Sequence, residues 1–143
     1  MRPGPGVLDT SVVILLDQLA ADADLPEEPL ITTVTLAELS VGPLVTDDAS
    51  ERAVRLARLQ VTEATFEPIP FDAPAARAFG RVAAELRGSG RRTKARSFDA
   101  IIAATALSRN LPVFTANAED FTGIEGLEVV PITPNRRPSR STL

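Results

Sequence analysis

Short apolar segments alternate along this chain with segments that have the apolar spacing of helices. We expect strands at residues 7–8, 30–34, 66–71, 111–115 and 127–132. We expect helices at residues 10–23, 35–42, 48–64, 72–86 and 97–109, and a single helical turn at 117–121. Strands that alternate with helices favour a parallel sheet covered by helices on both faces. The sequence therefore predicts an α/β fold: a three-layer α/β/α domain with a central, mainly parallel sheet of four to five strands.

The two ends of the chain are expected to differ from this pattern. The prolines and glycines between Arg2 and Gly6 are unsuited to regular structure, so the first strand should be little more than Val7 and Leu8. A chain of 143 residues is long enough for one domain with its own core. We expect a single domain at 1–132 and a basic, disordered tail at 133–143.

Several residue types that serve many catalytic sites are missing. Without cysteine there are no disulfides or thiol nucleophiles, and without histidine there is no imidazole base. Tryptophan and tyrosine, the usual stacking platforms for bases, are also absent. The net charge of −4 argues against a protein that simply coats nucleic acid. The longest apolar run, residues 12–16, is too short to span a bilayer, so we expect a cytoplasmic protein with no membrane partner.

Three carboxylates stand where a strand or a loop is expected to pass into a helix. Asp9 follows the first strand, Glu38 opens the helix after the second strand, and Asp99 opens the apolar helix FDAIIAATAL. Singly, they are explained as a helix N-cap, a capping-box member and an acid in a first turn. In a parallel sheet, however, such positions meet at one edge, where three acids repel unless a divalent cation neutralises them. The combination predicts a Mg²⁺ or Mn²⁺ site.

Polar residues near these acids are expected to support the site. Asn117 and Asp120 follow the fourth strand, either as an N-cap with its reciprocal partner or as a further oxygen ligand and a water-holding group. Ser11 and Thr115 carry hydroxyls on the same expected edge. There they would fix a carboxylate rotamer or a metal-bound water.

Four segments resemble, in order and spacing, the PIN-domain ribonucleases, and within them the VapC-type toxins of toxin–antitoxin pairs. The resemblance covers nearly the whole chain, from Val7 to Pro131. Its carriers are VLDTS at 7–11, TLAEL at 35–39, FDAIIAATA at 98–106, and FTAN at 114–117 followed by Asp120 and Phe121.

The resemblance implies a PIN-like fold in which Asp9, Glu38 and Asp99 are the metal-binding acids. The family's fourth acidic position falls on Asn117, where many members have aspartate, and Asp120 is the residue expected to compensate. Such enzymes are single-strand RNA endonucleases that often cut tRNA or rRNA. They are silenced by a cognate antitoxin that occupies the groove, and they commonly form homodimers. The resemblance implies the same substrate and partners for this chain.

The expected chemistry needs no side-chain base. A Mg²⁺ ion held by two or three carboxylates keeps several of its waters. One of these waters, acidified by the metal, can attack the scissile phosphate. We assign Asp9 and Asp99 as primary ligands, and Glu38 as a ligand or as the residue that orients the attacking water.

A basic stretch leads into Asp99 and is expected to hold the phosphate backbone of RNA. It consists of Arg87, Arg91, Arg92, Lys94 and Arg96. A solvated loop explains the same residues equally well. Arg55 and Arg58 lie mostly away from the apolar side of the expected helix at 48–64.

Two other functions are compatible with parts of the sequence. A non-catalytic module would keep the fold and bind RNA or a protein, with Asn117 as the first sign of a decayed site. A phosphatase with an aspartyl nucleophile would use Asp9, but that chemistry usually wants an acid two residues later, where this chain has Ser11. Among nucleases, DNA and structured flaps stay open as substrates.

Overall fold

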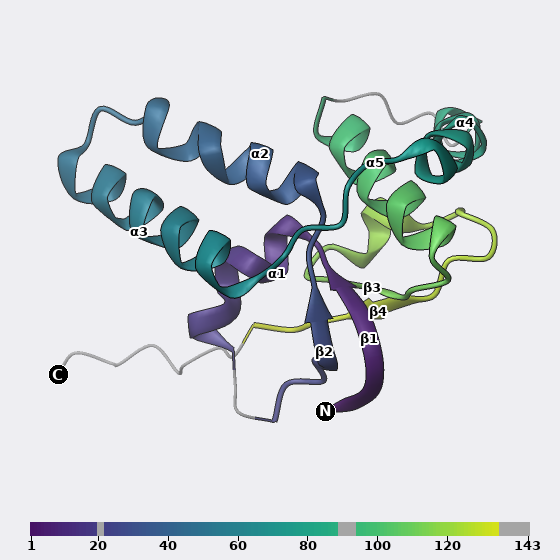
Figure 1. Ribbon diagram of the computed structural model, residues 1–143, viewed down its shortest axis with the longest axis horizontal. Helices are drawn as coiled ribbons and strands as arrows, with labels where there is room; N and C mark the ends of the chain where they lie inside the picture. The colour runs from purple at the N-terminus through teal and green to yellow at the C-terminus, as the bar shows by residue number, and fades with distance from the viewer. Residues whose placement is uncertain (20–21, 89–93, 135–143) are drawn as a thin grey trace, which may run out of the picture.

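Four parallel strands form the central sheet of the computed structural model (Figure 1). The structure describes residues 1–19, 22–88 and 94–134. The strands are β1 (Arg2–Leu8), β2 (Pro26–Leu30), β3 (Val113–Thr115) and β4 (Val129–Pro131), in the order β2-β1-β3-β4. Because β1 lies between β2 and β3, its carboxyl end is in the middle of the sheet edge.

Helices connect and cover these strands. They are α1 (Thr10–Leu15), η1 (Leu16–Gln18), α2 (Thr33–Val41), η2 (Gly42–Leu44), α3 (Ala49–Thr65), α4 (Ala73–Gly88), α5 (Lys94–Ser108) and η3 (Ala118–Phe121). The expected helices at 48–64 and 72–86 are confirmed within two residues, and each begins after an aspartate. Asp48 accepts a hydrogen bond from the Glu51 amide at 2.9 Å, and Asp72 accepts one from the Ala75 amide at 3.2 Å.

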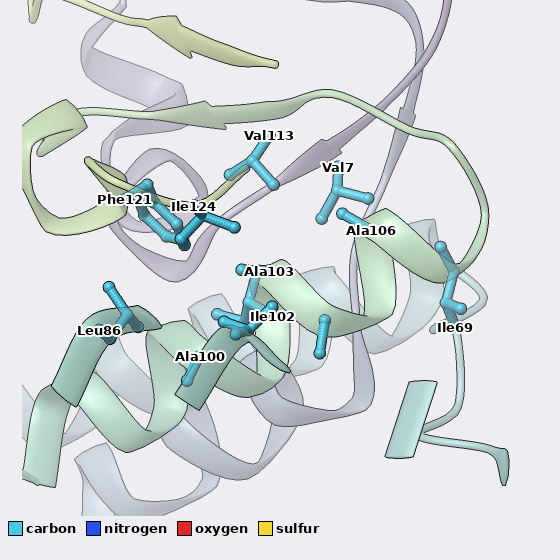
Figure 2. Packing of buried hydrophobic residues seen from close by; sticks show 12 residues of the cluster. Val7, Ile69, Leu86, Ala100, Ile102, Ala103, Ala106, Val113, Phe121 and Ile124 are labelled. Atoms are coloured by element: carbon cyan, nitrogen blue, oxygen red, sulfur yellow. The ribbon is translucent and has the colours of Figure 1, made fainter. Parts of the chain in front are cut away.

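Hydrophobic packing on both faces of the sheet confirms the three-layer α/β/α prediction. Successive residues of a strand point to opposite faces. Val7 and Val113 accordingly belong to a cluster with α4 and α5, whereas Leu8 and Phe114 belong to a second cluster with α1. Figure 2 shows Val7 and Val113 directed from the sheet toward the alanines of α5.

The proline-rich start of the chain is a strand, so the prediction that it has no regular structure is wrong. Residues 2–6 of β1 pair with β2, whereas β3 pairs with β1 at Val7 and Leu8. One edge of this stretch therefore needs no amide donor, and proline is tolerated there. The register shifts between Arg2 and Pro5, where Gly4 has a φ of 85°. Glycine reaches that backbone conformation without the strain that a side chain would cause.

Three more expected boundaries are wrong. The second strand is Pro26–Leu30 and not 30–34, because α2 already begins at Thr33. The segment 66–71 contributes a single bridge between Ile69 and Thr32 instead of a strand. The first helix ends at Leu15 and continues as η1, short of the expected residue 23.

Two further expectations concern the end of the chain and the membrane. From residue 135 onward, the expected tail at 133–143 lies outside the described residues. In the described part of the chain, every helix is too short or too polar to cross a bilayer.

Candidate metal site at the sheet edge

Asp9 lies at the carboxyl end of β1 and is the N-cap of α1. Its amide donates to the Phe114 carbonyl at 3.0 Å, which ties the end of β1 to β3. Its Oδ1 accepts hydrogen bonds from Ser11 Oγ at 2.6 Å and from the Val12 amide at 3.1 Å. The residue is 3% exposed, and this burial raises the pKa of Asp9 although these bonds and the Thr115 hydroxyl lower it.

Ser11 and Thr115 link the two strand ends around Asp9. The Ser11 hydroxyl donates to Asp9 and also accepts a hydrogen bond from the Ala116 amide at 3.0 Å. The Thr115 hydroxyl accepts one from the Asn117 amide at 3.0 Å. Each hydroxyl therefore contacts both Asp9 and the turn after β3, so the orientation of the carboxylate is fixed from two sides.

Glu38 reaches the same edge from α2, although it does not open that helix as predicted. The helix begins at Thr33 with Thr32 as N-cap, so Glu38 is its sixth residue and there is no capping box with Thr35. Burial raises the pKa of Glu38, and the charge of Asp9 raises it further. The structure thus brings these two acids close enough to repel one another.

Two threonines that sequence reasoning did not assign to the site hold Glu38 in place. Thr10 Oγ1 donates to Glu38 Oε1 at 2.7 Å and lies 3.0 Å from Thr35 Oγ1. Because a hydroxyl carries one proton, Thr10 must accept from Thr35 when it donates to Glu38. The detectable signal was the position of Thr10 directly after Asp9. Its side chain turns to α2, where it donates to Glu38.

Asp99 lies in the second turn of α5, so its predicted place at the start of a helix is wrong. Lys94, Ala95 and Arg96 extend this helix toward its N-terminus, and all three are good helix formers. The Asp99 side chain is half-buried. Within 1–19, 22–88 and 94–134, no three acidic side chains are grouped closely enough to bind one ion together. The structure joins Asp9 and Glu38 and does not join Asp99 to them as a third member.

The turn after β3 places Asn117 and Asp120 at η3. Asn117 stands at the N-cap position and is exposed, but its side chain makes no capping bond. Its carbonyl accepts a hydrogen bond from the Asp120 amide at 3.0 Å. This is the first backbone bond of η3, so the expected capping role of the Asn117 side chain is not seen.

The structure describes only part of the basic stretch that is expected to bind the phosphate backbone of RNA. Arg87 is exposed in the last turn of α4. Arg91 and Arg92 lie outside the described residues, and Lys94 and Arg96 lie in the first turn of α5. Binding of RNA phosphates by this stretch stays a prediction.

Residues of α3 line a cavity beside Glu38, which the helical pattern did not reveal. The cavity has a volume of about 370 Å³, and its walls include Thr10, Glu38, Arg55 and Arg58. The sequence pattern gave the side of α3 on which these arginines lie. It gave no sign of which element they would face.

The residues at this edge fit a hard divalent cation. Asp9 and Glu38 are mutually repelling carboxylates whose charged forms are disfavoured by burial, and a cation would relieve both effects. Carboxylate and hydroxyl oxygens are the ligands that Mg²⁺ and Mn²⁺ prefer. Since Mg²⁺ usually keeps several waters and binds one or two carboxylates, the pair suffices for a site without a third acid in direct contact.

Comparison with known proteins finds a matching family model and several relatives. The family model of the PIN domain matches residues 6–127. The chain is 42% identical over 132 residues to ribonuclease VapC5 of Mycobacterium tuberculosis, covering 91% of this chain and 95% of the relative. It is 37% identical over 103 residues to ribonuclease VapC8 of the same species, covering 72% and 91%. The crystal structure of VapBC-5, a toxin–antitoxin system of that species, matches with a TM-score of 0.74 and 40% identity, covering 90% of this chain and 99% of the matched chain.

Proposed function

This chain belongs to the PIN-domain family and is related within it to the VapC ribonucleases. From that premise we propose that it is a Mg²⁺- or Mn²⁺-dependent endoribonuclease and the toxin of a type II toxin–antitoxin pair. The observation that carries the proposal is the pair of acids at the carboxyl edge of the sheet, the buried Asp9 and the half-buried Glu38. Ligand sites of parallel α/β folds occur at this edge.

In the proposed mechanism, Asp9 and Glu38 would hold the cation, and the predicted role of Asp99 as a further acid stays a prediction. When bound, the cation would acidify a water and offset charge on the phosphate. Ser11 keeps the Asp9 carboxylate in one orientation, and the hydrogen bonds from Thr35 to Thr10 and from Thr10 to Glu38 do the same for the second acid. Without histidine or cysteine, the chain has no imidazole base and no thiol nucleophile, which fits attack by a metal-activated water.

The partners follow from the family. The matched VapBC-5 structure is described as a toxin–antitoxin system, and we propose that a cognate antitoxin protein likewise silences this chain. We propose tRNA or rRNA as the RNA substrate. A homodimer and a location in the cytoplasm stay predictions, as do supporting roles for Asn117 and Asp120.

Cleavage of a pool of cellular RNA by the purified protein tests this function. We expect discrete fragments with Mg²⁺ or Mn²⁺ and none with EDTA. Asp9→Asn should abolish cleavage because it removes a charge from the metal site. Asp47→Asn is the matched control, since Asp47 is an exposed acid on the loop before α3 and the change removes the same charge.

Calorimetric titration with Mn²⁺ separates the ways in which cleavage can fail. Wild-type protein that binds Mn²⁺ and cuts no RNA would point to a missing target or a retained inhibitor. Protein that neither binds the metal nor cuts would reject the nuclease and favour a non-catalytic module that binds RNA or a protein. Equal cleavage by wild type and Asp9→Asn would reject the assigned site.

A further inference from the structure

The cavity beside Glu38 lies between α1, α2 and α3 and carries charges of both signs. Its acidic lining residues are Glu38 and Glu51, and its basic lining residues are Arg55 and Arg58. Any strand of RNA that reaches the buried Asp9 and the half-buried Glu38 brings one negative charge per nucleotide toward these two acids. A cation contributed by the protein at this place would offset that repulsion.

Arg55 is committed to the protein itself. Its Nε lies 3.0 Å from Glu51 Oε1, one turn earlier on α3, and its Nη1 donates to the Gly42 carbonyl at 2.9 Å. These contacts hold α3 against the end of α2. The Glu51 carboxylate offsets the charge of Arg55, so this residue contributes little net charge to the cavity.

Arg58 lies one turn further along α3 and is placed differently. It is half-buried, and among the residues that the structure describes its guanidinium forms no ion pair. It also lines a second cavity of about 470 Å³, whose walls are mainly apolar and include Ile14, Val61 and Phe66. Arg58 therefore lines both cavities, one mainly apolar and one that contains Glu38. A long basic side chain at such a boundary can cover apolar surface with its methylenes and keep its charge for the polar side.

We propose that Arg58 binds a phosphodiester of single-stranded RNA next to the nucleotide that Asp9 and Glu38 engage. This inference rests on the proposed function and names a positioning residue for it. The guanidinium fork matches two phosphate oxygens, which a lysine ammonium does not. The substrate then approaches between α1 and α3.

Affinity for a fluorescent single-stranded RNA, measured by polarisation over a series of salt concentrations, tests this contact. The Asp9→Asn background prevents cleavage during the titration, so the measurement does not depend on activity. Adding Arg58→Gln should weaken binding about tenfold and reduce the slope of log K against log salt by about 0.7, the value for one phosphate on a single strand. Arg58→Lys should keep the slope and recover part of the affinity.

Arg77→Gln is the matched control, because Arg77 is exposed on α4 and the change removes the same charge. It should leave both affinity and slope close to those of the background. In otherwise wild-type protein with Mg²⁺, Arg58→Gln should raise KM about tenfold with little change in kcat, since the residue positions the strand. An unchanged urea midpoint establishes that the variant is folded.

The outcomes separate this inference from the proposed function. RNA cleavage with KM, affinity and salt slope unchanged by Arg58→Gln would overturn the inference and leave the nuclease. A salt slope that depends on Arg58, in a protein that binds no Mn²⁺ and cuts nothing, would support the contact and reject the nuclease. Unaltered RNA binding with lost binding of the antitoxin would overturn the inference and assign the cavity to the protein partner.

Discussion

A methyl group added at Gly6 should destabilise this protein strongly, because the strand there passes against a buried aromatic ring. An ideal Cβ on Gly6 would overlap Cε2 of Phe114, lie 2.9 Å from Cδ2 of the same ring, and lie 3.1 Å from Pro26 Cβ. Phe114 is 1% exposed and packs in the cluster with α1, so displacing the ring would disturb the packing of that cluster. Overpacking of this kind costs about 1–3 kcal/mol. Because the added methyl group would meet both the Phe114 ring and Pro26, we expect a cost near the upper end of this range.

The expected loss can be measured by urea denaturation and thermal unfolding. A loss of about 3 kcal/mol would take a large part of a domain's usual stability of about 5–15 kcal/mol. It corresponds to a decrease in Tm of roughly 6–12 °C for a chain of this size. Gly80→Ala is the control, because Gly80 is exposed within α4 and a Cβ there meets no heavy atom within 4 Å. It should stabilise the protein by about 0.5–1 kcal/mol.

A double-mutant cycle identifies the ring as the cause. Replacing Phe114 by leucine removes ring atoms from the overlap, so Gly6→Ala should cost less in the Phe114→Leu background than in the wild type. A coupling above about 1 kcal/mol would be expected for side chains in contact. Gly6→Ala with wild-type stability, or an equal cost in both backgrounds, would refute this account of the packing.

Three further predictions concern polar groups. Burial holds the pKa of Asp9 above its ordinary value of 3.8, so its contribution to stability is full below that value and is lost as pH rises through the folded-state pKa. Asp9→Asn in EDTA should therefore be more stable than wild type at pH 7 by on the order of 1 kcal/mol, and equal at pH 3, in urea titrations. Thr10→Val removes the donor to Glu38 Oε1. The pKa of Glu38 should rise further, and the acidic limb of the pH–rate profile should move to higher pH, with Thr10→Ser restoring it; an unmoved limb would exclude Glu38 as its origin. Thr32→Val should stabilise the protein by about 1 kcal/mol, because in the described structure the buried Thr32 hydroxyl has no hydrogen-bond partner; a lower urea midpoint would show that this hydroxyl is satisfied in solution.

The sequence by itself determined the layers of the fold and the meeting of Asp9, Ser11 and Thr115 at one edge of the sheet. Alternating apolar segments and helical patterns fix a parallel α/β architecture, because periodicities of 2 and 3.6 are local properties of the chain. Asp9 could be placed at a strand end for the same reason, since Val7 and Leu8 precede it and hydroxyl residues follow. The N-caps Asp48 and Asp72 were equally local signals.

Tertiary structure decided what the chain pattern leaves open. Proline and glycine at 2–6 form a strand because β2 offers a partner on one edge and the other edge is left unpaired there. Residues 30–34 have strand propensity, yet most of them enter α2 or its N-cap because packing overrides intrinsic preference.

The contacts within the site also depend on the assembled sheet. Thr10 bonds to Glu38 across 28 residues, and Ser11 accepts from the Ala116 amide across 105 residues. The placement of Arg58 at the boundary of two cavities likewise requires α1 and α3 to lie side by side. A local pattern carries no information about which distant segment a side chain will meet, and the physical reason is that the packing of the whole core fixes those distances.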